Sequence, residues 1–252
     1  MMHRGALSLF SVIAMFGPAA LHAEDSVSRE AALFDRPAAV RSVPPKTDND
    51  PAGEIRCTYY GDFMVRETGT DSPAPGPAAI IPAPDAGRRP ACNAAPAART
   101  VPLKTEEHAL LGRKGPFLVF EAADPYGAVP FIVLDANTGR LIYSDGKHTD
   151  GLRSVALEGG ALRIRYPRAF NGACSIIKDE AGCWSKIALA ANVPPALAQS
   201  PPPVPACTTA YRRAEAPADG PSMIIYDLDV TLDISGRTQV NSFGTVGCEP
   251  MP

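Results

Sequence analysis

Six cysteines constrain the fold of this 252-residue chain more than any other feature of its sequence. Their number is even and their spacing is wide, which is typical of structural disulfides in proteins that fold outside the cytoplasm. The chain lacks a Cys-x-x-Cys motif, whereas zinc sites group their ligands at short spacing. The sequence therefore predicts disulfides and neither a metal nor another cofactor. The cysteines are Cys57, Cys92, Cys174, Cys183, Cys207 and Cys248.

Local spacing favours one pairing of these cysteines. The predicted bridges are Cys57–Cys92, Cys174–Cys183 and Cys207–Cys248. The segments 57–81 and 207–225 support the two longer bridges, because each begins with Cys-Thr and later contains Gly-Pro-x-x-Ile-Ile. Chance similarity in a chain rich in alanine and proline is the alternative explanation. The bridge in the middle is expected to close a hairpin loop.

The N-terminal residues 1–23 have the order of an export signal. Arg4 provides a cationic start, an uncharged and mostly apolar run covers residues 6–16, and small residues precede a cleavage point after Ala23, as in secretory signal peptides. An uncleaved N-terminal anchor is the alternative, but the apolar run is shorter than the roughly 20 residues that span a bilayer. We therefore expect a periplasmic or secreted, soluble protein without a membrane span.

Proline content and net charge narrow the possible secondary structure and the possible partners of the protein. Of the 27 prolines, 18 lie at residues 37–51, 73–102 and 194–205, where the fixed φ and missing N–H of proline favour extended connectors over helices or central strands. The formal net charge is −3. This balance argues against a nucleic-acid partner, because such partners select a basic face.

Alternation of apolar and polar residues with period two predicts antiparallel strands. The clearest run is 222–234, in which every even-numbered residue from Ile224 to Ile234 is apolar. The predicted fold class is mainly β: antiparallel meanders packed as a sandwich or curved sheet, held by disulfides, with very little helix. Further strands are expected at 55–67, 117–120, 130–135, 140–144, 153–158, 161–166, 208–213 and 237–246, and one short helix at 105–111.

These patterns divide the chain after the signal into a tail and a domain. Residues 24–53 are predicted to be a loosely ordered N-terminal tail, and residues 54–252 a single β domain held by disulfides. Within that domain we expect the blocks 54–103, 104–193 and 206–252, with a proline-rich connector at 194–205 between the last two.

An acidic ladder of Asp227, Asp229 and Asp233 lies on the polar face of the 222–234 strand. Carboxylates two residues apart on a strand are close enough to share a cation or a basic partner. Together with the exposed ring expected for Tyr60, they form our candidate binding surface. A solvated outer face, which discourages edge-to-edge pairing of sheets, is the simpler alternative, and a straight strand supplies too few oxygens for calcium.

Two acidic segments are candidates for catalysis. Glu121, Asp124 and Tyr126 follow a buried strand, and a carboxylate pair there suits acid–base chemistry such as glycoside hydrolysis. The segment 144–150 contains a serine, a histidine and two aspartates, but members of a Ser-His-Asp triad normally come from distant parts of the chain. Solvated loops explain both segments more simply.

The predicted function is that of an exported, non-enzymatic module that binds a ligand or associates with the cell envelope. The sequence does not identify its partner, and an envelope polymer and an envelope protein are the two candidates. A basic stripe of Arg163, Arg165 and Arg168 suits an anionic polymer, although a solvated sheet face also explains it. The alternative function is a secreted hydrolase that uses carboxylates of 121–126 or 144–150.

Overall fold

The computed structural model describes residues 30–47, 53–70, 75–83, 89–93, 99–105, 107–122 and 127–251. Within these ranges the chain is mainly β, with two antiparallel sheets and three short helices, which confirms the predicted fold class. None of the described helices is long and apolar enough to cross a membrane. The predicted export signal lies outside the described residues. The bridges are Cys57–Cys92, Cys174–Cys183 and Cys207–Cys248, the pairing that local spacing favours.

The first sheet corrects the prediction of a loosely ordered tail over residues 24–53. Residues 39–43 of that tail form an edge strand that pairs antiparallel with the strand containing Cys57. The outer face of this sheet packs Tyr59, Met64 and Ile81 around the Cys57–Cys92 bridge. In chain order, which is also their order in the sheet, its strands are β1 (Ala39–Val43), β2 (Ile55–Tyr59), β3 (Phe63–Thr68), β4 (Ala79–Pro82) and β5 (Val101–Pro102).

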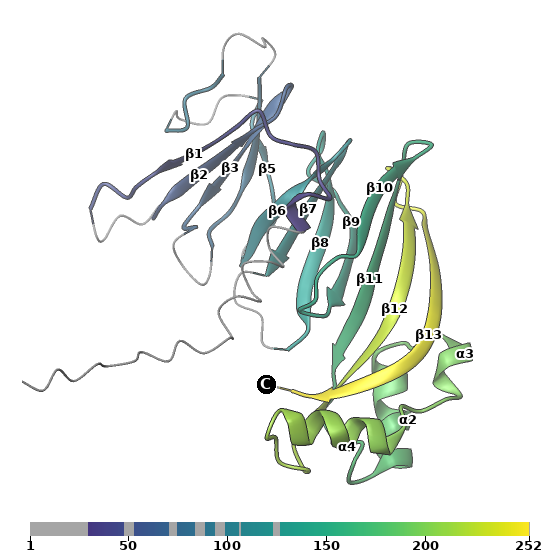
Figure 1. Ribbon diagram of the computed structural model, residues 1–252. Coiled ribbons are helices and arrows are strands. Elements are labelled where there is room, and N and C mark those ends of the chain that lie inside the picture. Colours follow the sequence, from purple (N-terminus) through teal and green to yellow (C-terminus); the bar gives the residue numbers. More distant parts are fainter. Residues whose placement is uncertain are drawn as a thin grey trace, which may run out of the picture.

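The second sheet is larger and strongly curved (Figure 1). Its strands follow the order β13-β12-β11-β9-β8-β7-β6, and β10 pairs with β11 beside this path. Most neighbours are also neighbours in sequence, as expected for meanders. The strands are β6 (His108–Lys114), β7 (Phe117–Ala122), β8 (Val129–Asp135), β9 (Leu141–Lys147), β10 (Ser154–Glu158), β11 (Ala161–Asn171), β12 (Ser222–Leu232) and β13 (Thr238–Pro250).

Strand β7 shows how the two sheets are layered. Leu118 and Phe120 point into a core shared with Val65 and Ile80 of the first sheet, whereas Phe117 points to the opposite face of β7. Because the side chains on both faces of β7 are fully buried, its sequence is a continuous apolar run without alternation. The two sheets therefore pack as a sandwich over this part of the second sheet.

The face of the second sheet that is turned away from the first sheet is called here the inner face. Leu228, Val230 and Leu232 of β12 lie on it and are at most 3% exposed, as their alternation predicts. Figure 1 shows the helices gathered at one end of the sheet, beside β12 and β13. They are α2 (Glu180–Ala190), α3 (Pro195–Ala198) and α4 (Val204–Arg213).

Two segments predicted as β structure or connector are helices. The Asp179 carboxylate caps α2 by accepting a hydrogen bond of 3.0 Å from the Gly182 N–H, and Asp is a strong N-cap residue. The Cys174–Cys183 bridge therefore joins a turn to a helix and does not close a hairpin loop. Helix α4 replaces the predicted strand at 208–213 and takes in the end of the proline-rich connector, because a proline in the first turn of a helix loses no hydrogen bond.

The helix predicted at 105–111 is also wrong, since this segment leads into strand β6. β6 pairs antiparallel with β7 and is irregular between Leu110 and Gly112. Glu67 of β3 fills the irregularity, where its Oε1 accepts a hydrogen bond of 2.7 Å from the Leu110 N–H. Its Oε2 is buried without a hydrogen-bond partner among the described residues, and burial raises the pKa of Glu67. Pairing with the buried β7 strand outweighs the local helix signal.

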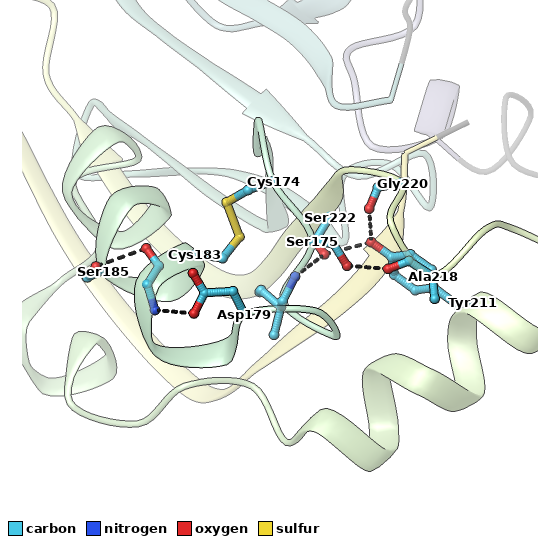
Figure 2. Close-up of a disulfide and its surroundings, with 11 residues drawn as sticks. Cys174, Ser175, Asp179, Cys183, Ser185, Tyr211, Ala218, Gly220 and Ser222 are labelled. Atoms are coloured by element: carbon cyan, nitrogen blue, oxygen red, sulfur yellow. Dashed lines mark hydrogen bonds between the residues drawn. A yellow bond between two sulfur atoms is a disulfide. The ribbon is translucent and has the colours of Figure 1, made fainter.

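Figure 2 shows how the helical end is fastened to the sheet. The Tyr211 hydroxyl of α4 donates to the Gly220 carbonyl at 3.0 Å and lies 2.6 Å from the Ser222 hydroxyl at the start of β12. The Ser175 hydroxyl, next to the Cys174–Cys183 bridge, donates to the Ala218 carbonyl at 2.6 Å. The segment that leads into β12 is thus held from both sides.

Candidate functional site

A cleft of about 660 Å³ lies at the helical end of the molecule, between α4 and the last residues of β13. Its lining is mainly alanine, proline and methionine, and its ionisable side chains are His148, Arg213 and Glu249. Segments far apart in the sequence meet here: the turn after β9, the end of α4 and the end of β13. The apolar side chains are Ala210, Ala214, Ala216, Pro217, Met223, Pro250 and Met251.

The walls of this cleft are fixed before any ligand arrives. The Cys207–Cys248 bridge joins α4 to β13 with a Cα–Cα distance of 5.2 Å. Tyr211, one turn further along α4, is 2% exposed and holds the helix to the start of β12 by the contact with Ser222. The helix therefore has a covalent link to one strand and a hydrogen bond to the next, so the cleft is preformed.

His148 forms the polar end of the cleft. Its Nε2 lies 3.3 Å from the Glu249 carboxylate at the end of β13, and its Nδ1 lies 3.2 Å from the Asp150 carboxylate. The hydrogen bond with Glu249 raises the pKa of His148, with a further contribution from Asp150 and an opposing one from burial. The same hydrogen bond lowers the pKa of Glu249. The geometry therefore favours an ion pair that links the turn after β9 to β13.

A second hollow, of about 390 Å³, lies where β9, β11 and β12 meet the turn after α2. Asp145 and Arg168 face each other in it, with Arg168 Nε 2.7 Å from the Asp145 carboxylate. The predicted basic stripe is therefore split, because strand alternation places Arg163 and Arg165 on the outer face and Arg168 on the inner face. The Asp145 carboxylate also accepts hydrogen bonds from Tyr143 and Tyr166.

Lys147 is the most deeply buried lysine that the structure describes, with a side chain 3% exposed. Its Nζ lies 3.1 Å from Glu30 and 2.9 Å from Glu121. Glu30 also accepts a hydrogen bond from the Leu152 N–H. Because Glu30 belongs to the predicted tail, this cluster shows that the tail is held against the second sheet at residue 30.

Asp227 and Asp229 of the acidic ladder lie on the outer face of β12 and Asp233 lies in the turn after it, with each carboxylate already paired. Asp227 accepts from Arg153 at 2.8 Å, and Asp233 closes a turn with Arg237 at 2.5 Å. Asp229 is only 8% exposed, which contradicts the expectation of a solvated carboxylate. The bidentate hydrogen bonds from Arg163, 2.8 and 2.6 Å long, lower the pKa of Asp229.

Tyr60 does not belong to that surface. It is 7% exposed and packs with Phe63 in the core between the two sheets, with the Arg113 guanidinium 5.3 Å from its ring centre. Burial raises the pKa of Tyr60 to about 12. The expectation of an exposed ring is wrong, because the residue directly follows β2 and its ring packs into the core shared with the second sheet.

The two segments predicted for catalysis form no common site among the described residues. Asp124 and Tyr126 lie outside these residues, and Glu121 is paired with Lys147. Ser144 and Asp145 are neighbours on β9 and so point to opposite faces, with Ser144 exposed. The residues around His148 are carboxylates, and no serine hydroxyl is bonded to it within the described part of the chain.

Sequence reasoning missed the residues that build the cleft. The strand predicted at 208–213 includes Ala210 and Arg213, and Met251 carries no sequence signal. The only available signal is the i, i+3 and i, i+4 spacing of Ala210, Arg213 and Ala214, which is that of one helix face.

No family model, no curated protein and no solved structure matches this chain.

Proposed function

We propose that this chain is an exported, non-enzymatic binding protein that holds a small ligand in the cleft between α4 and β13. The observation that carries the proposal is the cleft itself. Its volume of about 660 Å³ falls within the range of small-molecule sites, and its apolar lining with a few polar groups at one end is their usual composition. An envelope component is the proposed source of the ligand, and the periplasm or the secreted fraction is the proposed location.

The charges at the cleft support binding more than hydrolysis. A general acid needs a carboxyl whose pKa is raised toward the working pH, whereas the hydrogen bond from His148 lowers the pKa of Glu249. Asp150, the other carboxylate beside His148, is held in the same ion-pair arrangement. The arrangement suits a fixed polar end that orients a ligand.

The test is a fluorescence titration of the protein without residues 1–23, using anilinonaphthalene sulfonate as the probe. This dye has an apolar body and one anionic group, so it matches both ends of the cleft. We expect Ala210→Phe, which fills the cleft, to weaken binding by at least about tenfold. Ala206→Phe, on an exposed turn of the same helix, is the matched control and should bind like the unmodified protein. Equal binding by both variants would refute the assignment of this cleft.

A further inference from the structure

We propose a second binding site in the hollow on the inner face, for a neutral polyhydroxylated ring such as one sugar unit of a glycan. The hollow has a volume of about 390 Å³ and is separate from the cleft at α4. Four strands (β9, β11, β12 and β13) and the turn after α2 contribute to it. The proposal is independent of the ligand in the α4 cleft.

Arg168 is held in one position and retains unused donor capacity. Its Nε donates to Asp145, and its Nη1 donates to the Ala191 carbonyl at 2.6 Å and to the Tyr226 hydroxyl. Its Nη2 has no hydrogen-bond partner among the described residues, and the side chain is 18% exposed. Guanidinium nitrogens carry only donors, so the free edge of Arg168 selects an acceptor atom.

The end of helix α2 supplies the carbonyl that holds Arg168. Asn192 has a positive φ of 48°, and its N–H donates to the Leu189 carbonyl while the Val193 N–H donates to the Ala188 carbonyl. This is the Schellman arrangement that ends many helices. It leaves the Ala191 carbonyl directed at Arg168 and places the exposed Asn192 amide at the rim of the hollow.

Asp145 positions the site and does not itself contact the ligand. Its Oδ1 accepts from Arg168 and from the Gly146 N–H, and its Oδ2 accepts from the hydroxyls of Tyr143 and Tyr166. Burial and the charge on Asp145 raise the pKa of both tyrosines, so the hydroxyls stay protonated. All four acceptor positions of the carboxylate are therefore occupied.

The charge balance of the hollow favours a neutral ligand. Asp145 and Arg168 are its two charged lining residues, and their charges cancel at close range. An anion bound to Arg168 would also lie near the Asp145 carboxylate, which offsets most of the attraction. The hollow is a neutral site with many hydrogen-bonding groups.

The groups that remain free match hydroxyls and an apolar ring face. Arg168 Nη2, the Tyr226 hydroxyl proton and the Asn192 amide offer donors, while the Asn192 carbonyl offers an acceptor. A hydroxyl group both donates and accepts, so several hydroxyls on one ring can use both kinds of group. The apolar lining suits the C–H face of such a ring and consists of Val193, Pro194, Pro195, Leu228 and Val240.

The test is isothermal titration of the protein without residues 1–23 against glucose, N-acetylglucosamine and chitotriose as neutral probes. Glucuronate and inorganic phosphate are the anionic probes. We expect one neutral sugar to bind with a stoichiometry of one, and Asn192→Gly and Tyr226→Phe each to weaken it by about tenfold or more. Glycine retains the backbone conformation of Asn192, and the Tyr226 change removes only one oxygen, so both variants should fold.

Matched controls separate this site from the rest of the molecule. Asn241→Ala removes an exposed amide from β13, and Tyr59→Phe removes a buried hydroxyl in the first sheet; both should bind like the unmodified protein. Ala210→Phe should also bind normally, since it fills the other cleft. Binding of the anionic probes alone, or no binding of any neutral probe, would overturn the proposal. So would an affinity of Asn192→Gly and Tyr226→Phe equal to that of the unmodified protein.

Discussion

Replacing Lys147 with methionine should destabilise the fold strongly. Methionine has about the same length and no charge, so the change removes the ion pairs and keeps most of the packing. The lysine side chain is 3% exposed and lies between Glu30 and Glu121. In Lys147→Met, two carboxylates remain close together in a site where water is scarce.

The size of the loss follows from how buried each carboxylate is. Removing one partner of a buried ion pair costs about 3–5 kcal/mol, because a charge is left without compensation. The Glu30 side chain is 8% exposed, whereas that of Glu121 is 27% exposed and regains part of its hydration. Glu30 also keeps the hydrogen bond from Leu152. We therefore expect a loss of about 3 kcal/mol in the free energy of unfolding, at the lower end of that range.

This loss of stability is measured by urea denaturation without reductant, and unfolding is followed by the fluorescence of Trp184. Lys186→Met, at an exposed position of α2, is the control and should stay within about 0.5 kcal/mol of the unmodified protein. A triple variant with Glu30→Gln and Glu121→Gln added to Lys147→Met should recover most of the stability, because no charge is left uncompensated. If Lys147→Met behaves like the control, or the triple variant recovers nothing, the argument from buried charge is wrong.

Two further predictions concern the buried carboxyl group of Glu67 and the two faces of β12. The pKa of Glu67 is raised by burial, so the folded state keeps a proton that the unfolded state has lost, and stability falls as pH rises from the ordinary glutamate value through the folded one. Glu67→Gln removes this fall. In denaturation curves, the stability of this variant relative to the unmodified protein should therefore improve between pH 4.5 and pH 7. A difference in stability that stays constant over this range would contradict the raised pKa of Glu67. Leu228→Ala should cost about 2–5 kcal/mol of stability, because it leaves a cavity. Asp229→Asn should cost about 1 kcal/mol, because it weakens a partly exposed ion pair. Thermal melts in which Asp229→Asn is the more destabilised variant would show that the two faces of β12 are misassigned.

The strands with regular alternation could be predicted from the sequence. Leu228, Val230 and Leu232 lie on the inner face as expected, because a period of two fixes which residues share a face. The three bridges also follow the local spacing of the cysteines. In both cases the information lies within a short stretch of chain.

The helices and β6 needed information from outside their own segments. Proline suggested connectors at 194–205, but Pro205 lies in the first turn of α4, where it is tolerated. The pattern at 105–111 looked helical, yet β7 offers a buried partner strand. Pairing of this kind depends on a segment elsewhere in the chain and outweighs a weak local preference.

The candidate sites were the least predictable part. The cleft brings His148, Arg213 and Glu249 together, and none of these residues carries a signal that names the other two. The paired state of Asp229 also depends on Arg163 of the neighbouring strand, at a register that the sequence does not state. Sequence patterns describe the face of one strand, whereas a site depends on which strands are neighbours.

The Cys207–Cys248 bridge makes the shape of the cleft between α4 and β13 depend on the redox conditions in which the chain folds. Its two sulfur atoms belong to the two walls of the cleft, helix α4 and strand β13. In a reducing compartment these cysteines stay as thiols, and the helix is then held to the sheet by Tyr211 and neighbouring packing alone. A chain in which this pair is reduced therefore lacks the fixed width of the cleft, and oxidation of the two thiols completes it. Under the proposed function, only the oxidised chain has a preformed site for its ligand.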